Sequence, residues 1–338
     1  MPKFCCPECF GDSGLRRSII PSLTPVRGDC HYCKTSDVDL VNPRALTEVF
    51  EMFISVYEAD EGGKLLVEWM KTDWELFPIF DVAHAKELLS DILDDGEIVR
   101  KTFSPSQTFK SEGLARWTTL RDELMYKNRY FLDQELDKDR LRELLSLLLT
   151  DDLPEYWYRA RMTASNNKFP IDEMGAPPKN LATHGRANPT GIPYLYLGSL
   201  PDTAIAEIRP HTGEVACVGK FKLQRKITVV DLQNPRKLVS PFILEDAKSI
   251  GQLRADIDFL ERLGIELTRP VQPRSAAIDY LPSQYLCEFI KKSGYDGVIY
   301  RSSVSDGVNL ALFHPDDAIA LETDLYEVDR VSVEISRQ

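Results

Sequence analysis

Apolar residues recur at three- and four-residue steps through much of the first half of the chain. From Leu46 to Tyr57 this spacing predicts an amphipathic helix, which the pair Gly62-Gly63 interrupts. Further helical segments are predicted at 65–69, 85–93, 121–136 and 138–149, with a loop at 101–113. Apolar stripes opposite charged faces are what packed helices require. Residues 42–150 are therefore predicted to form an all-helical domain.

The second half of the chain has short apolar runs separated by turns, which is the pattern of β-strands. Strands are predicted at 156–161, 194–197, 215–223, 226–232, 298–300 and 309–313, and helices at 203–208, 243–263 and 283–293. The last helix ends at Gly294, a residue type that commonly terminates helices. Because the strands alternate with a few helices and no regular βαβ repeat, residues 151–338 are predicted to form an α+β domain.

Cysteines crowd into the beginning of the chain, where five of the seven lie within the first 33 residues. Four of them form two Cys-x2-Cys pairs: Cys6, Cys9, Cys30 and Cys33. Two such turns bring four thiolates to one point and complete a tetrahedral zinc site with no open position. We therefore predict a structural zinc knuckle over residues 1–41, with Cys5 and His31 left open as alternative ligands. Cys217 and Cys287 lie in apolar stretches and are predicted to be buried packing residues.

The net charge of the chain bears on whether it binds nucleic acid. The 338 residues carry a formal net charge of −12 and contain no block rich in Lys or Arg, which disfavours a nucleic-acid-binding surface. No apolar run approaches the roughly 20 residues of a membrane span, and the N-terminus has no signal-peptide pattern. The protein is therefore expected to be cytoplasmic, with no membrane contact. Neither a Rossmann glycine motif nor a P-loop occurs.

A Gly/Asn/Pro-rich loop after residue 184 carries the best candidate chemistry. It holds Arg186, the following strand carries Tyr196, and the next helix carries Glu207. Arginine is the forked donor that suits phosphate oxygens, and a carboxylate can stabilise a developing cation. On residue types alone, a surface arginine and a solvated glutamate would be the commoner interpretation.

The order and spacing of these residues resemble the RES family, which is named for an arginine, a glutamate and a serine. The matching core is Gly185-Arg186-Ala187-Asn188, then Gly191-Ile192-Pro193, then Tyr196, with Glu207 eleven positions later. Upstream, 157–161 is similar to the family's opening strand with its arginine. Downstream, 294–303 and 309–313 resemble the strand with the serine and the closing strand with an asparagine. The resemblance covers about 155–325.

The resemblance implies an ADP-ribosyltransferase-like fold and an enzyme that cleaves NAD at the nicotinamide–ribose bond. Arg159 and Arg186 would clamp the pyrophosphate, and Glu207 would stabilise the cationic ribose. Tyr196 would offer a ring to nicotinamide or a hydroxyl to the ribose, and Ser302 would bind substrate through hydrogen bonds. Ser303 could take the place of Ser302, and Arg161 that of Arg159. The acceptor would be water, phosphate or a protein side chain.

The sequence leaves the role of the helical segment, the partners and the exact reaction open. The helical segment is similar to the HEPN-like domains attached to some longer RES proteins, but it lacks their Arg-x4-6-His ribonuclease motif and is expected to be non-catalytic. A toxin or defence role would imply an antitoxin or immunity protein as a partner, and self-association to a homo-oligomer is not decided. The alternatives are a protein ADP-ribosyltransferase and an inactive module that senses nucleotides or binds partners. Because all three named residue types are present, an enzyme is favoured.

Overall fold

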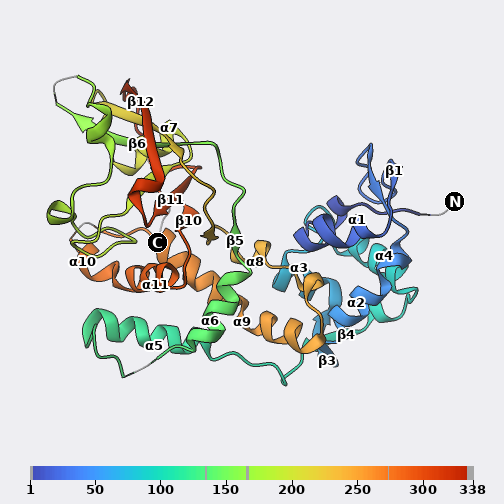
Figure 1. Cartoon of the computed structure of the whole chain (residues 1–338). Helices are drawn as coiled ribbons and strands as arrows, with labels where there is room; N and C mark the ends of the chain where they lie inside the picture. Colours follow the sequence, from blue (N-terminus) through green and yellow to red (C-terminus); the bar gives the residue numbers. More distant parts are fainter. Residues whose placement is uncertain (1–2, 134, 165–166, 273, 333–338) are drawn as a thin grey trace. The chain divides into compact units, whose positions relative to one another are not determined.

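The computed structural model describes residues 3–133, 135–164, 167–272 and 274–332, which form two compact units (Figure 1). The first unit contains Met1–Ala115 and Asn234–Glu261, and the second contains Arg116–Gln233 and Arg262–Gln338. These units do not coincide with the predicted boundaries after residues 41 and 150. Apolar periodicity identifies a helix but not the element against which it packs. No helix in the described part of the chain is long and apolar enough to cross a membrane.

The first unit is mainly helical and has an aromatic core. Phe50 and Phe53 of α2 pack with Phe10 and Phe77, and Phe242 lies 4.8 Å from Phe50 between ring centroids. Phe242 explains why residues from the middle of the second half of the chain belong to this unit. Its elements are η1 (Pro7–Cys9), the π-helical η2 (Leu15–Ile19), α1 (Ile20–Ser22), β1 (Val26–Gly28), β2 (Val38–Leu40), η3 (Pro43–Leu46), α2 (Thr47–Ile54), β3 (Tyr57–Leu65), α3 (Leu66–Trp74), α4 (Val82–Leu93), η4 (Ile98–Arg100), β4 (Thr102–Pro105), α8 (Pro235–Leu238) and η7 (Pro241–Ile243).

The prediction that residues 42–150 are all helical is wrong, because the segment contains the strands β3, β4 and β5 (Leu149–Thr150). The helix predicted over 121–136 also ends at Tyr126. Strand β3 pairs antiparallel with β4, so the segment predicted as a loop at 101–113 contains a strand. The Gly62-Gly63 pair, predicted only to interrupt a helix, lies within β3. A Cβ atom at Gly63 would collide with the carbonyl of Phe103, so glycine permits the close approach of the two strands. Most of β3 is exposed and polar, which is why the hydrophobic pattern did not reveal it.

The second unit is built on a mixed eight-stranded sheet, and the prediction of strands interleaved with a few helices is confirmed. The strand order is β12-β8-β6-β7-β11-β10-β9-β5, with only β9 and β10 parallel. The strands are β5 (Leu149–Thr150), β6 (Tyr156–Thr163), β7 (Leu195–Gly198), β8 (Val215–Leu223), β9 (Val229–Asp231), β10 (Gly297–Arg301), β11 (Val308–Leu312) and β12 (Ala318–Glu327). The edge strand β12 was not predicted; it opens with the short apolar run 318–321 but is mostly exposed and carries acidic residues.

Helices and short turns complete this unit. They are α6 (Lys138–Ser146), η5 (Ile171–Met174), η6 (Lys179–Leu181), α7 (Pro201–Glu207), α10 (Ala276–Asp279), α11 (Leu281–Lys292) and η8 (Pro315–Asp317). Two helices run through both units, namely α5 (Gly113–Tyr126) and α9 (Ala247–Thr268). One side of the sheet is closed by a core that includes Trp157, Leu197 and Leu310. On α7, Ala204 packs with Ala160 and Val218, so small side chains let this helix lie close to the sheet.

Strand register lines up four residues across the sheet. Tyr158 of β6 lies opposite Gly198, Gly198 lies opposite Asn309, and Asn309 lies opposite Tyr300. Directly opposed residues project from the same face of a sheet. The row therefore places two tyrosines and an asparagine from three strands on one face.

A buried carboxylate fixes the C-terminal end of α9. Glu266 has no exposed side-chain surface, and the Nε atoms of Arg121, Arg262 and Arg269 lie 3.2, 3.1 and 3.3 Å from its carboxylate oxygens. The Nε atoms of Arg121 and Arg269 lack well-aligned hydrogen bonds, so these contacts are ion pairs set by distance. Arg121 and Arg269 each have a second, longer ion pair of 3.6 Å, with Asp122 and Asp279 respectively. Among the described residues, Glu266 is the carboxylate within ion-pairing distance of all three arginines.

Replacement of Glu266 with leucine is expected to destabilise the protein by about 3 kcal/mol, because it leaves three neighbouring guanidinium groups without their shared carboxylate. Urea unfolding measures this change. The matched control is Glu322→Gln, whose carboxylate forms an exposed pair with Lys220 at 3.2 Å and should matter little. Equal midpoints for Glu266→Leu and the control would show that the buried cluster contributes nothing.

Candidate active site and metal centre

A cavity of about 440 Å³ lies in the second unit, at the face of the sheet that carries the cross-strand row. Strands β6, β7, β10 and β11, the end of α7, the loop at 184–186 and residues of the 271–280 segment contribute to its lining. Of the predicted site residues, five line it: Arg159, Arg186, Tyr196, Glu207 and Ser303. Segments that are far apart in the sequence thus meet at one cavity.

Glu207 is the last residue of α7 and is held by two neutral donors. The Ser302 hydroxyl donates to its Oε1 atom at 2.7 Å, and the Asn309 side-chain amide donates to the same oxygen at 2.6 Å. The other carboxylate oxygen, Oε2, has no hydrogen-bond partner among the described residues. One oxygen is therefore fixed by the protein, and the other is left for whatever enters the cavity.

Ser302 and Ser303 occupy different positions. Ser302 is buried and contacts Glu207, whereas Ser303 belongs to the lining of the cavity. The resemblance implied that Ser302 binds substrate through hydrogen bonds, and this stays a prediction; in the structure its hydroxyl supports the Glu207 carboxylate. Asn309 plays the same part, and its role was not predicted because nothing in the sequence pairs it with Glu207.

Arg159 is a half-buried cation that has no counter-charge among the described residues. Its Nε atom is fully buried and has no hydrogen-bond partner among residues that the structure describes. Burial, followed by the positive charge of Arg161, lowers the pKa of Arg159 to about 10, so the group remains charged at neutral pH. An unpaired buried charge is costly unless a ligand supplies the partner. Arg161, the alternative, donates to the carbonyl of Glu173 at 2.5 Å and stacks on Phe169, outside the cavity lining.

Arg186 is held in place before any ligand binds. Its Nη1 atom donates to the carbonyl of Arg269 at 2.8 Å, just after the end of α9. Its guanidinium carbon lies 5.2 Å from the centroid of the Tyr280 ring, a cation–π distance. Tyr280 is therefore the aromatic residue that packs against the loop arginine. Tyr280 was not predicted, because it is 94 positions away in the sequence.

Tyr196 organises the loop that carries Arg186. Its hydroxyl accepts from the backbone amides of Ala187 and Asn188 at 2.9 and 3.2 Å, and donates to the Asn188 side chain at 2.8 Å. Burial raises the pKa of Tyr196, so the phenol keeps its proton. One donated and two accepted bonds use the full capacity of a phenol. Tyr196 therefore offers the cavity its ring and not its hydroxyl.

Further residues of the lining were not among the predicted site residues. Tyr300 is buried, and burial together with nearby Tyr196 and Glu207 raises its pKa, so it stays a neutral donor. Arg209 follows Glu207 closely and has a backbone φ of 51°, a strained conformation for a residue other than glycine. His184 also lines the cavity, whereas His211 does not.

The cavity is cationic in an acidic protein. Three arginines and one glutamate line it, which gives a net charge of +2 in a chain of net charge −12. The described residues include no carboxylate within ion-pairing distance of Arg159, Arg186 or Arg209. Such a concentration of one sign in a concave site attracts ligands of the opposite charge. The site is therefore suited to an anion.

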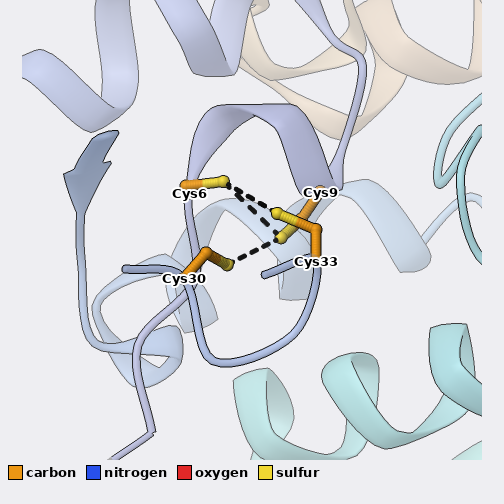
Figure 2. A group of neighbouring side chains, drawn as sticks. All are labelled: Cys6, Cys9, Cys30 and Cys33. Carbon is orange, nitrogen blue, oxygen red and sulfur yellow. Dashed lines mark hydrogen bonds between the residues drawn. The ribbon is translucent and has the colours of Figure 1, made fainter. Parts of the chain in front are cut away.

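The first unit gathers the four predicted cysteine sulfurs (Figure 2). The Sγ atoms of Cys6 and Cys33 are 3.3 Å apart, those of Cys9 and Cys30 are 3.4 Å apart, and all four lie within 4.8 Å of one another. Cys5 is outside the cluster and contacts the carbonyl of Val41, and His31 packs edge-on against Tyr32. Neither alternative ligand is brought to the site.

This donor set fits a metal ion. Four free thiols at these separations are too far apart for disulfides. Tetrahedral coordination with Zn–S bonds of about 2.3 Å would place sulfurs roughly 3.8 Å apart, close to the observed spacing. Four sulfur ligands favour zinc over hard cations such as Mg²⁺. The cluster could therefore hold a structural metal, for which zinc is our proposal.

The fold and the cavity define a mixed α/β domain with a cationic ligand-binding site. The chain belongs to the RES domain family, since that family's sequence model matches residues 156–330, just over half of the chain. No curated protein matches the sequence. Among solved structures, the chain is similar to the Mycobacterium tuberculosis MbcT–MbcA toxin–antitoxin complex, with 14% identity, a TM-score of 0.32 and coverage of 55% of this chain and 92% of that chain. At this level of likeness no function carries over from one protein to the other.

Protein purified without chelators is expected to contain about one zinc ion per chain, because four thiolates fill a tetrahedral shell. Elemental analysis measures the content. Cys30→Ser should abolish stable binding, whereas Cys5→Ser should retain it, since the Cys5 sulfur lies outside the cluster. Metal-free protein, or loss of the metal in the Cys5 variant, would contradict the assignment.

Proposed function

We propose that the chain is an NAD-degrading enzyme that cleaves the nicotinamide–ribose bond. The observation that carries the proposal is that Arg186, Arg159 and Glu207 line one cationic cavity. The buried Nε atom of Arg159 has no partner among the described residues, and two hydrogen bonds hold the Glu207 carboxylate. Membership of the RES family supports the same chemistry. The reaction would be that of a glycohydrolase or a phosphorylase, according to whether water or phosphate is the acceptor.

The arginines account for recognition of the dinucleotide. The pyrophosphate of NAD presents anionic oxygens, which guanidinium groups bind through paired charge-assisted hydrogen bonds. Arg159 would gain in this way the partner that its buried Nε atom lacks. Arg186 uses Nη1 on the Arg269 carbonyl and keeps its other donors for the ligand. The cavity's net charge of +2 matches two phosphate charges.

Glu207 accounts for bond cleavage. As the bond between the ribose anomeric carbon and the nicotinamide nitrogen breaks, its electron pair leaves with neutral nicotinamide and the ribose becomes an oxocarbenium-like cation. A carboxylate aimed at that centre stabilises the transition state more than the ground state. Ser302 and Asn309 support this role, because they hold Oε1 and leave Oε2 toward the ligand. The acceptor then bonds to the anomeric carbon and releases its proton.

The finer assignments remain part of the proposal. The arrangement is consistent with an ADP-ribosyltransferase-like fold, and depletion of NAD would make the protein a toxin or defence effector with an antitoxin or immunity protein as partner. The metal cluster and the helices of the first unit would provide structure or a docking surface. A HEPN-like origin of those helices stays a prediction.

Glu207→Gln is expected to lower kcat for nicotinamide release by about 10² or more, since one lost electrostatic contact is worth roughly 2.7–4 kcal/mol. Glutamine keeps the size and an acceptor for Ser302 and Asn309, so the Kd for NAD should change little. Glu155→Gln, which removes an exposed partner of Lys222, is the matched control. Equal turnover by the wild type and Glu207→Gln would refute the assignment.

Arg186→Lys is expected to act on binding and not on the chemical step. Lysine keeps the charge but cannot form the paired hydrogen bonds or the stack on Tyr280. The KM for NAD should rise by about tenfold, with kcat within about threefold of the wild type. Initial rates over a range of NAD concentrations separate the two parameters. A fall in kcat with an unchanged KM would mean that Arg186 contacts the reacting centre instead.

The principal alternative is transfer of ADP-ribose to a protein. Incubation with labelled NAD and separation of protein from small molecules distinguishes the two. Label in free product supports degradation, whereas label bound covalently to protein supports a transferase. Tight binding of NAD without any nicotinamide release would instead support a nucleotide-sensing module.

A further inference from the structure

We propose that Ser283 and Gln284, in the first turn of α11, are positioning residues that fix the loop carrying Arg186. The inference rests on the proposed function, because it assigns Arg186 to the substrate. Neither residue lines the cavity, and each reaches it only through the loop backbone.

The two side chains bind consecutive carbonyl groups of the loop. The Ser283 hydroxyl lies 2.6 Å from the carbonyl oxygen of Arg186, and the Gln284 amide donates to that of Gly185 at 2.8 Å. Ser283 also lies 3.0 Å from the carbonyl of Tyr280, which is an ordinary contact within one helical turn. The bonds to Gly185 and Arg186 span nearly 100 positions of sequence, so they tie α11 to the loop.

Both side chains that form these hydrogen bonds are buried, which raises the cost of losing the bonds. Ser283 is 0% exposed and Gln284 is 6% exposed. Polar groups in such places are costly unless they are hydrogen-bonded, so their retention in the interior calls for a specific partner. The loop carbonyl is the one partner that the described structure gives to the Gln284 side chain.

Hydrogen bonds hold both the carbonyl groups and the amide groups of the loop backbone. The carbonyls of Gly185 and Arg186 accept from α11, while the amides of Ala187 and Asn188 donate to the Tyr196 hydroxyl. A Cβ atom at Gly185 would collide with Asn188 and Tyr196, which shows how closely the loop is packed. Because its backbone is fixed in this way, the Arg186 side chain has few accessible orientations. Its guanidinium group lies over the Tyr280 ring before a ligand binds.

A preorganised arginine binds its ligand without a cost of ordering the loop. Loss of an α11 bond should therefore weaken NAD binding and leave the chemical step unchanged. Gln284→Met keeps the side-chain length and removes the donor, and Ser283→Ala removes the hydroxyl. Each is expected to raise the KM for NAD by about three- to tenfold, the size of one net hydrogen bond, with kcat unchanged.

A double-mutant cycle separates positioning from a general structural role. If Gln284 acts through Arg186, adding Gln284→Met to Arg186→Ala should change KM by less than about twofold, because the group being positioned is gone. A structural defect would instead add its full effect in both backgrounds. The matched control is Ser293→Ala at the other end of α11, where the hydroxyl donates to the Phe289 carbonyl at 2.9 Å. It should have wild-type KM.

Hydrogen exchange of the ligand-free protein gives a readout that does not depend on catalysis. Gln284→Met should speed exchange of the amides at 185–188 at least threefold, and Ser293→Ala should not. Unchanged loop exchange, or additive effects on KM in the cycle, would overturn the inference. If the wild type released no nicotinamide, the proposed function would fail, and loop exchange would still decide whether α11 holds the loop.

Discussion

A carboxylate and three guanidinium groups line one cavity without pairing with each other. Glu207 accepts from two neutral side chains, Ser302 and Asn309, although arginines line the same cavity. Opposite charges that line one cavity could form ion pairs, so the scaffold must hold these groups apart. The arrangement keeps a cationic surface for an anionic ligand and a free carboxylate oxygen for a cationic centre. It costs stability in the empty protein, most clearly at the half-buried Arg159.

The scaffold resists pairing because Glu207 and Arg186 are each held by hydrogen bonds to neighbouring elements. The cross-strand row places Asn309 beside Tyr300, and small residues let α7 bring Glu207 to the sheet. The end of α9, fixed by its buried glutamate, presents the Arg269 carbonyl to Arg186. Sites built on such elements hold their geometry better than sites built on free loops. The Arg186 loop behaves as a rigid element because its backbone is bonded on both sides.

The sequence predicted the residues that we propose to act on a ligand better than the residues that hold them in place. The four clustered cysteines stand at a spacing that by itself indicates a metal site. Arg159, Arg186 and Glu207 stand in short local patterns as well, but it was the resemblance of those patterns to the RES family that identified them. Asn309, Tyr280 and Gln284 contribute through contacts across long stretches of chain, and no local pattern records such a contact. Their residue types are also common in ordinary helices and strands.

The fold was predictable to a similar degree and for similar reasons. Buried strands such as β8 have continuous apolar runs and were predicted at the observed bounds. The strands β3 and β12 are mostly exposed and rich in polar residues, and both were missed. The division into units depended on Phe242 entering an aromatic core more than 160 residues earlier in the sequence. Hydrophobic periodicity indicates that one face of a helix or strand is buried. Only the tertiary structure shows which element covers that face.

The central claim is that this cavity breaks the bond between nicotinamide and ribose. The most direct test is to incubate purified protein with NAD, with and without phosphate, and to identify the products by mass spectrometry. The account predicts free nicotinamide in equal amount to ADP-ribose or its phosphate adduct, with the pyrophosphate intact in both. Intact NAD under every acceptor condition, or products split at the pyrophosphate, would contradict it.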